Sequence, residues 1–398
     1  MRMSRINVLA LSYLFPNRAQ PAYGIFVLNR LRAVSQHCRI NVIAPVQWYP
    51  LIGLVRGSLW GTDVPRYEEI GGLSVYHPRF AVVPRYMKWL DAITYFFAAH
   101  RVVRRQRFEF DLVDVHWTYP DIVAAAVLAS TNGKKFVVTV RGHEALYLNE
   151  RTLRRRLVAH FLRKAAAVIT LSTQLRDKVV SLGVAADRVS VVLNGVDLAH
   201  FSMQDREECR RQLELPSAAR ILISVGRLTE GKGHQDLLRS LSQLGRDEDV
   251  RLYIIGGVNP EDDYQHVLRR LIADLQLTNV HLVDKVPHER LSLWYGAADV
   301  FCLASKSEGC PNVVLESLAC GTPVVATDVG AIADVVTPGE SGFLVGPRYA
   351  QSLTQALRAA LVHPWDRAAI AARMSRWGWE KCADEVYSLY QSVLRERR

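Results

Sequence analysis

The sequence predicts an α/β protein built from two doubly wound domains that face each other, with a ligand cleft between them. Short apolar runs alternate with helical stretches, and this pattern restarts after His200. The chain has 398 residues, too many for one ordinary core. Ligands of open parallel sheets bind outside the carboxyl ends of the strands, so two such sheets predict a cleft between the domains.

Six apolar runs in the first half are bounded by polar or turn residues, as buried parallel strands are. They are Ile6–Leu11, Ile40–Ala44, Leu112–His116, Phe136–Val140, Val168–Leu171 and Val189–Leu193. Helical stretches such as Ile25–Gln36 and Asp121–Ala129 lie between them. This order is typical of βαβ units.

The second half repeats the alternation. Its predicted strands are Ile221–Val225, Arg251–Ile255, Val280–Val283, Val300–Leu303, Pro323–Ala326 and Phe343–Val345, and its predicted helices are Gln235–Gln243, Tyr264–Leu275, Pro287–Ala297, Val313–Ala319 and Leu353–Leu361. We therefore place an N-terminal domain at residues 1–198 and a C-terminal domain at 199–375. Trp377 to Val393 has the pattern of an amphipathic helix lying across both domains, so residues 376–398 would return to the first.

The composition is that of a globular protein, with 49% hydrophobic and 22% charged residues. No apolar run approaches the roughly 20 residues that span a bilayer. The N-terminal basic residues and apolar run imitate a signal peptide, but a small-residue cleavage site is missing and a first buried strand fits better. The six cysteines form no CxxC pair and no disulfide framework, so we expect a reduced, cytoplasmic protein.

The net charge of +11 is concentrated in the first half. Residues 1–200 hold 27 Lys and Arg against 13 Asp and Glu, whereas residues 201–398 hold 23 against 26. This asymmetry indicates an anionic partner surface, either a membrane or nucleic acid. We expect no nucleic acid, because no helix-turn-helix, RNP-like or zinc-finger pattern is present.

Two stretches combine basic residues with a helical pattern. Residues 85–107, RYMKWLDAITYFFAAHRVVRRQR, place aromatic side chains beside seven basic ones, His100 included, and residues 150–164, ERTLRRRLVAHFLRK, are also basic. Basic and aromatic side chains on a helix suit a membrane interface. The alternative is a core helix with a solvated basic end.

The stretch SKSEGCPNVVLE, residues 305–316, places two glutamates around a tight turn. Pro311 suits the first turn of a helix, so Glu308 and Gly309 would lie in the preceding loop and Glu316 on the helix. A strand, a tight loop and a helix N-terminus can bind an anionic or hydroxyl-rich ligand. The alternative is an ordinary βα unit with two solvated glutamates.

The first strand of the second half runs into SVGRLTEGKG, residues 224–233. Glycines such as Gly226 let the backbone approach a ligand, and Arg227 and Lys232 place two cations at the strand end. A guanidinium fork and a mobile ammonium can share the charge of a diphosphate. The spacing is not that of a Walker loop, and a solvated loop is the alternative.

The first half offers its own strand-end candidates. Gly24 follows the first strand and opens a helix, although no GxGxxG fingerprint is present. His116, in VHWTYPD with Tyr119, ends one strand, and Arg141 and His143, in RGHE, follow another. Lone histidines are more often structural, but two clusters opening onto one cleft favour function. We expect no metal, because no His, Cys and Asp set has ligand spacing.

These motifs resemble the GT-B glycosyltransferases, and within them the large retaining family 4. The resemblance covers nearly the whole chain and rests on ITLS at 169–172, NGVD at 194–197, SVGRLTEGKG, the run from 297 to 330, and GESGFLV at 339–345. It implies two Rossmann-like domains and a nucleotide-diphosphate sugar as donor. The opening FPNRAQPAYGIFVLNRL looks like members that build bacterial surface polysaccharides.

The resemblance also implies residue roles. Arg227 and Lys232 would hold the donor diphosphate as it leaves, Glu308 would face the sugar, and Glu316 would bind the ribose hydroxyls. The implied donor-binding set is Gly24, Gly226, Gly309, Cys310, Pro311, Asn312, Val313 and Glu316, and the acceptor side comprises His116 and Tyr119. Many members carry histidine where this chain has Arg141, so either Arg141 or His143 takes that catalytic role.

We expect sugar transfer with retention at the anomeric carbon, without a metal or other cofactor, to a membrane-proximal or lipid-linked glycan acceptor. The basic domain would dock on the inner face of the plasma membrane. One alternative is a nucleotide-sugar 2-epimerase of the same architecture. Another is a catalytically inactive, membrane-associated scaffold.

Overall fold

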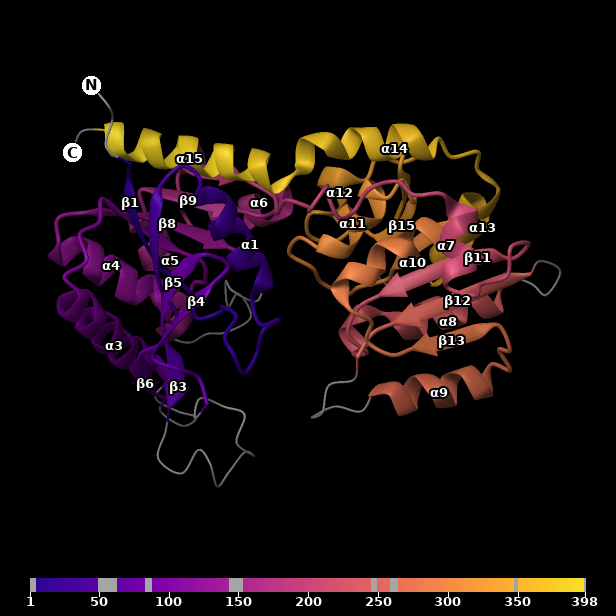
Figure 1. Cartoon of the computed structure of the whole chain (residues 1–398), viewed down its shortest axis with the longest axis horizontal. Helices are drawn as coiled ribbons and strands as arrows, with labels where there is room; N and C mark the ends of the chain where they lie inside the picture. The colour runs from indigo at the N-terminus through magenta and orange to yellow at the C-terminus, as the bar shows by residue number, and fades with distance from the viewer. Residues whose placement is uncertain are drawn as a thin grey trace. The chain divides into compact units, whose positions relative to one another are not determined.

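A computed structural model of the chain describes residues 5–48, 63–82, 88–142, 153–244, 249–257, 264–346 and 350–396. The chain forms two compact units (Figure 1). Unit 1 comprises Met1–Asn194 and Trp379–Arg398, and unit 2 comprises Gly195–Gly378. These divisions lie within four residues of the boundaries placed from the sequence.

Unit 1 is built on an eight-stranded sheet in the order β10-β9-β8-β7-β1-β2-β5-β4. Six strands match the apolar runs: β1 (Asn7–Leu11), β2 (Arg39–Ile43), β7 (Leu112–Val115), β8 (Lys135–Val140), β9 (Ala167–Thr170) and β10 (Val189–Val191). All six pair in parallel, so their carboxyl ends share one edge of the sheet.

Among the described residues between 45 and 82 lie four further strands, outside the six apolar runs placed from the sequence. β4 (Tyr67–Ile70) and β5 (Leu73–Tyr76) form an antiparallel hairpin, and β3 (Val46–Trp48) pairs in parallel with β6 (Arg79–Ala81). The hairpin turns at Gly71 and Gly72, both at positive φ, which glycine adopts without steric cost. Runs of three or four residues are too short to show a clear period.

Helices cover both faces of this sheet (Figure 1). α1 (Ile25–Val34) and α15 (Trp379–Arg395) pack on one face, against Val8, Ala10 and Val42. The other face carries α3 (Asp91–Gln106), α4 (Asp121–Thr131), α5 (Leu153–Lys164) and α6 (Thr173–Ser181). Because successive strand side chains point to opposite faces, each central strand contributes to both cores.

Unit 2 holds a six-stranded sheet, in which every pair is parallel, in the order β13-β12-β11-β14-β15-β16. Its strands are β11 (Arg220–Val225), β12 (Val250–Ile255), β13 (Val280–Val283), β14 (Val300–Leu303), β15 (Val324–Thr327) and β16 (Gly342–Val345). One face packs against α10 (Leu291–Ala297), α11 (Asn312–Ala319) and α14 (Arg367–Arg373), the other against α8 (His234–Ser242), α9 (Tyr264–Asp274) and α13 (Ala350–Val362).

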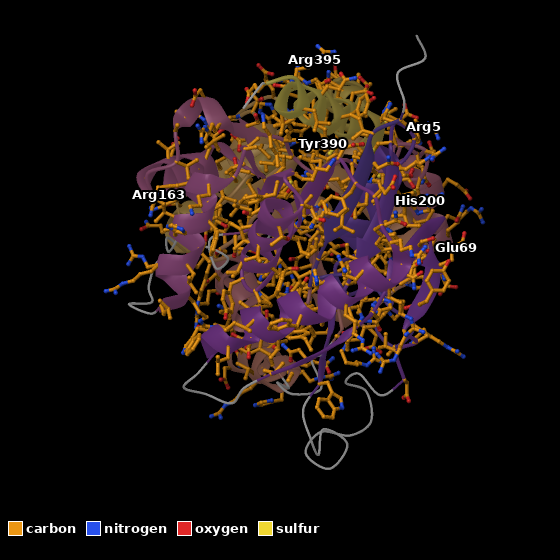
Figure 2. All side chains as sticks on the ribbon, turned by 90° about the vertical axis from the view of Figure 1, so that its left-hand side faces the viewer. Arg5, Glu69, Arg163, His200, Tyr390 and Arg395 are labelled. Atoms are coloured by element: carbon orange, nitrogen blue, oxygen red, sulfur yellow. The ribbon has the colours of Figure 1, made fainter. Side chains whose placement is uncertain are left out.

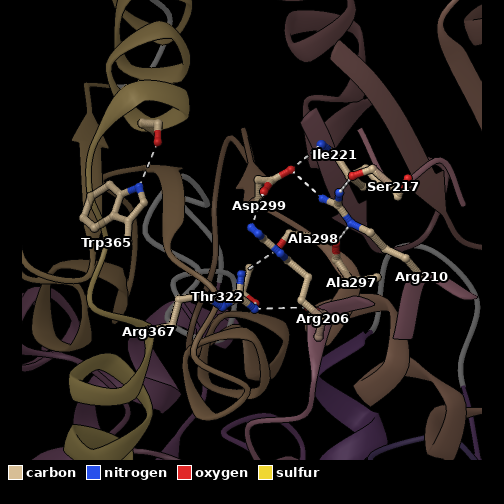
Figure 3. A network of polar contacts seen from close by, with 12 residues as sticks. Arg206, Arg210, Ser217, Ile221, Ala297, Ala298, Asp299, Thr322, Trp365 and Arg367 are labelled. Carbon is tan, nitrogen blue, oxygen red and sulfur yellow. Dashed lines mark hydrogen bonds and ion pairs between the residues drawn. The ribbon is translucent and has the colours of Figure 1, made fainter. Parts of the chain in front are cut away.

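A polar network ties the amino-terminal ends of β11 and β14 together (Figure 3). Asp299 accepts from the Ile221 amide at 2.7 Å and from Arg206 and Arg210 at 2.8 Å each. Arg210, in α7 (Arg206–Gln212), also donates to the Ala297 carbonyl at 3.0 Å. This network lies opposite the carboxyl edge of the sheet, so we assign it to stability and not to ligand binding.

Within the described ranges, no helix combines the length and apolar character that crossing a bilayer requires.

Candidate active site

The two charged loops of unit 2 follow neighbouring strands, because β11 pairs with β14. Lys232 Nζ lies 2.6 Å from Glu308 Oε1, and Ser305 Oγ donates to the same oxygen at 2.6 Å. Arg227 is exposed in the loop that carries Lys232. The fold therefore brings two cations and a carboxylate to one edge of the sheet, although 76 positions separate Lys232 from Glu308.

Backbone contacts hold the β11 loop in place. The Gly226 amide donates to the Ile255 carbonyl at 3.0 Å, and the Lys306 amide donates to the Gly231 carbonyl at 2.9 Å. Gly233 has φ +70°, and a Cβ there would lie 1.8 Å from the Ala304 carbonyl oxygen. Any larger residue at 233 would force the two charged loops apart.

A second glycine supports the glutamate loop. Gly330 has φ +63°, and a Cβ there would lie 2.4 Å from the Glu308 carbonyl oxygen. The Ala331 amide donates to the Gly309 carbonyl at 2.9 Å. The loop then enters α11, whose N-cap is Pro311, so Asn312 and Val313 open its first turn and Cys310 lies just before the N-cap. The positive end of a helix dipole thus adjoins Glu308 and Lys232.

Glu316 is buried on α11, with 5% of its surface exposed. Its Oε2 accepts from the Tyr295 hydroxyl at 2.9 Å, and its Oε1 lies 3.0 Å from His288 Nε2. The hydrogen bond with Glu316 raises the pKa of His288, while burial and Glu316 together raise the pKa of Tyr295. Glu316 is therefore a fixed acceptor, and the interpretation as a solvated glutamate is wrong.

In unit 1, Gly24 stands at the N-cap of α1 with φ +70°. A Cβ at this position would lie 2.6 Å from the carbonyl carbon and oxygen of Leu14. The residue must therefore be glycine for the chain to turn from β1 into α1 at this point.

The strand ends of unit 1 meet in a buried polar chain. Arg141 Nη2 donates to His116 Nδ1 at 2.9 Å, so the ring proton of His116 sits on Nε2, which lies 2.7 Å from Asp114 Oδ2. The Tyr390 hydroxyl donates to the same Asp114 oxygen at 2.5 Å. Figure 2 shows the side chain of Tyr390, which belongs to α15, pointing into unit 1, whereas Arg395 of the same helix projects at the outer side.

Burial and nearby charges set the protonation of the linked side chains His116 and Asp114. Burial lowers the pKa of His116, which therefore stays neutral. Burial works to raise the pKa of Asp114, but the contacts with His116 and Tyr390 prevail and lower it. The Arg141 guanidinium carbon lies 5.1 Å from the centroid of the Phe26 ring, a cation–π contact that helps to fix this side chain at the end of β8.

Tyr119 and His143 are the remaining N-terminal candidates. Tyr119 is buried and precedes a cis peptide bond to Pro120 at the start of α4. His143 lies outside the described residues.

Several partners of the predicted residues were not identified from the sequence. Tyr295 and His288 contact Glu316 from 21 and 28 positions away along the chain, and Ser305 contacts Glu308 from three positions away. Asp114 had a usable signal, because Asp-x-His on one strand places both side chains on the same face. In the part of the chain that the structure describes, no three His, Cys, Asp or Glu side chains gather as a metal site would require.

Two family models cover most of the chain. "Glycosyl transferases group 1" matches residues 205–377, and "Glycosyltransferase Family 4" matches residues 59–200. The chain is 27% identical over 361 residues to TuaC of Bacillus subtilis, a glycosyltransferase named for teichuronic acid biosynthesis, and the match covers 88% of each. It is 36% identical to a D-inositol 3-phosphate glycosyltransferase of Acidothermus cellulolyticus, over 57% of this chain and 53% of that protein.

Solved structures share the fold. Sucrose-phosphate synthase of Thermosynechococcus elongatus superposes with a TM-score of 0.77 at 20% identity, covering 98% of this chain and 99% of that one. HepE of Anabaena, solved with UDP and glucose, superposes with a TM-score of 0.72 at 19% identity, covering 98% and 100%. At these identities the likeness concerns the fold alone.

Proposed function

The chain is a GT-B glycosyltransferase of the family 4 type, and we propose that it moves a hexose from a nucleotide-diphosphate sugar to a glycan acceptor with retention at the anomeric carbon. The observation that carries this proposal is the meeting of Lys232, Arg227 and Glu308 at the carboxyl edge of the second sheet, beside the N-terminus of α11. Cations and a helix N-terminus suit a diphosphate, and a fixed carboxylate suits hydroxyl groups.

Each group has a place in donor binding. Lys232 and Arg227 bind the diphosphate, the turn from Gly309 to Val313 orients phosphate and sugar, and Glu316 accepts from the ribose hydroxyls. Lys232 is paired with Glu308, so donor binding would exchange this ion pair for a bond to phosphate. Glu308 is then released to accept from a hydroxyl of the sugar.

The transfer step breaks the bond between the anomeric carbon and the leaving phosphate oxygen. The bonding electron pair goes to that oxygen, where Arg227 and Lys232 stabilise the charge that develops. The acceptor hydroxyl oxygen bonds the anomeric carbon from the same face through an oxocarbenium-like state, and its proton passes to the departing phosphate. In unit 1, Arg141 at the end of β8 takes the strand-end role and supplies a further positive charge. Charge neutralisation comes from these side chains, so the proposed reaction needs no metal.

The acceptor we propose is a lipid-linked or membrane-proximal glycan of a cell-surface polysaccharide. The name of TuaC, with which this chain aligns over most of its length, supports a polysaccharide product. The charge asymmetry supports a position at the inner face of the plasma membrane, because residues 1–200 carry 27 basic against 13 acidic side chains.

The test is a donor assay with and without acceptor. UDP-glucose is the first donor to try, since HepE, which shares the fold, was solved with it. We expect release of the nucleoside diphosphate to require a glycan acceptor and the product to keep the donor's anomeric configuration. Conversion of the donor to its epimer without acceptor would instead establish a 2-epimerase. Failure to bind any nucleoside diphosphate would establish an inactive scaffold.

A further inference from the structure

One exposed face of α3 is apolar at its N-terminal end and cationic at its C-terminal end. Ile93 and Phe97 project outward, and Phe97 is 62% exposed. Arg101, Arg104 and Arg105 follow on the same face at helical spacing and are exposed. The opposite face packs Tyr95, Ala99 and Val103 into the core. Packing in the core thus accounts for the apolar residues on one side of the helix, but not for the exposed Phe97 on the other.

The arginines of this face have no acidic counterpart. Among the described residues, Arg101, Arg104 and Arg105 form no ion pair, and the single acid of α3, Asp91, is buried at its start. α5 contains no acid and carries five Arg and Lys residues. α3 and α5 flank α4 on the same face of the sheet (Figure 1). This side of unit 1 therefore presents excess positive charge.

An open groove of about 800 Å³ runs along this helix beside β6. Phe80, Ala81 and Ala98 make its walls apolar, while Arg101, Arg104 and Arg105 line its cationic side. Such a groove suits an amphiphile, with acyl chains or glycerol against the apolar wall and a phosphate at the arginines.

We propose that the α3 face docks on an anionic phospholipid bilayer. Ile93 and Phe97 enter the interface between headgroups and acyl chains, and the three arginines bind lipid phosphates. The choice of lipid follows from charge complementarity combined with an exposed apolar strip, which a purely hydrophilic polyanion would leave in water. This inference deepens the proposed membrane location, but it does not depend on sugar transfer.

The test measures binding of the full chain to vesicles by co-sedimentation. Phosphatidylglycerol-rich vesicles should bind the protein, neutral phosphatidylcholine vesicles should bind it weakly, and salt should reduce the difference. Replacing Arg101, Arg104 and Arg105 by Gln should weaken binding about 100-fold. Phe97→Ser should weaken binding at both low and high salt, because salt does not screen the contribution of an apolar side chain.

A matched control replaces Arg32, Arg39 and Arg188 by Gln, because these arginines are exposed elsewhere on unit 1 and the change in net charge is equal. Equal loss in both triple variants, or equal binding of wild type to neutral and anionic vesicles, would overturn the proposal. Nucleoside diphosphate binding, measured on the same samples, tests the donor site separately. Retained nucleotide binding without vesicle binding would refute the docking face alone.

Discussion

His288 Nε2 lies 3.0 Å from Glu316 Oε1, so an exposed histidine occupies one oxygen of the carboxylate proposed to bind the ribose. The other oxygen accepts from the buried Tyr295 hydroxyl. Asp197 and Glu289 add to the negative field around His288, whose ring also packs edge-on against Phe201. Donor binding must therefore compete with His288, while Tyr295 keeps the carboxylate in place.

This competition predicts a pH dependence of donor affinity. The pKa of His288 is raised, so its bond to Glu316 is strongest at low pH and weakens as pH rises through that pKa. The stability of the ligand-free protein from this pair is present below the unfolded pKa of 6.5 and is lost as pH rises through the folded one. Nucleoside diphosphate affinity should show the opposite trend. Titrations from about pH 5.5 to 8.5 should show the step in wild type and not in His288→Ala.

Asp121 predicts a second pH effect on stability, which has the same sign as that of His288. Its Oδ1 accepts from the Tyr13 amide at 2.6 Å and the Tyr95 hydroxyl at 2.5 Å, and burial raises its pKa from 3.8 to about 7. Between these values the folded protein holds a proton that the unfolded chain has released, so stability falls as pH rises through this window. The Tm of Asp121→Asn should lack this slope. An unchanged slope would contradict the assignment.

Removing Asp299 should strongly destabilise unit 2. Arg210 is buried, and Asp299→Ala would leave its charge without a counter-ion, at a cost of about 3–5 kcal/mol. Arg206→Ala is the matched control, because that side chain is 46% exposed and its ion pair contributes at most about 1 kcal/mol. Chemical denaturation of both variants measures the difference, and equal losses would show that the buried pair has no special role.

Arg141→Ala should lower kcat by about 10²–10³-fold, by analogy with the loss of one preorganised donor. His116→Phe should cause a smaller loss, because it removes the acceptor that holds Arg141 Nη2 and leaves the cation itself. Arg141→Lys should restore part of the rate, since it restores the charge without the fork. If His143→Ala alone abolished turnover, and Arg141→Ala did not, the strand-end role would belong to His143.

The sequence predicted which strands carry the charged loops better than it predicted the contacts that these loops make. Long apolar runs such as β8 and β12 are recognisable as buried strands from their length and composition. The glycines and charged residues that follow such runs located Lys232 and Glu308 at strand ends. The three- and four-residue strands between 45 and 82 carry too little pattern to be recognised. His288 and Tyr390 reach Glu316 and Asp114 only through tertiary packing, which spacing along the chain does not encode.

The central claim is that Arg227 and Lys232 bind the diphosphate of the donor. The most direct measurement is the Tm shift of the full chain with UDP, GDP and ADP, in wild type, Arg227→Ala, Lys232→Ala and the control Lys381→Ala, an exposed lysine of α15. At a hundredfold excess over Kd a bound ligand adds about 2.7 kcal/mol of stability. We expect at least one diphosphate to stabilise wild type and the Lys381 control but not the two site variants. Equal shifts in all four proteins would contradict the account.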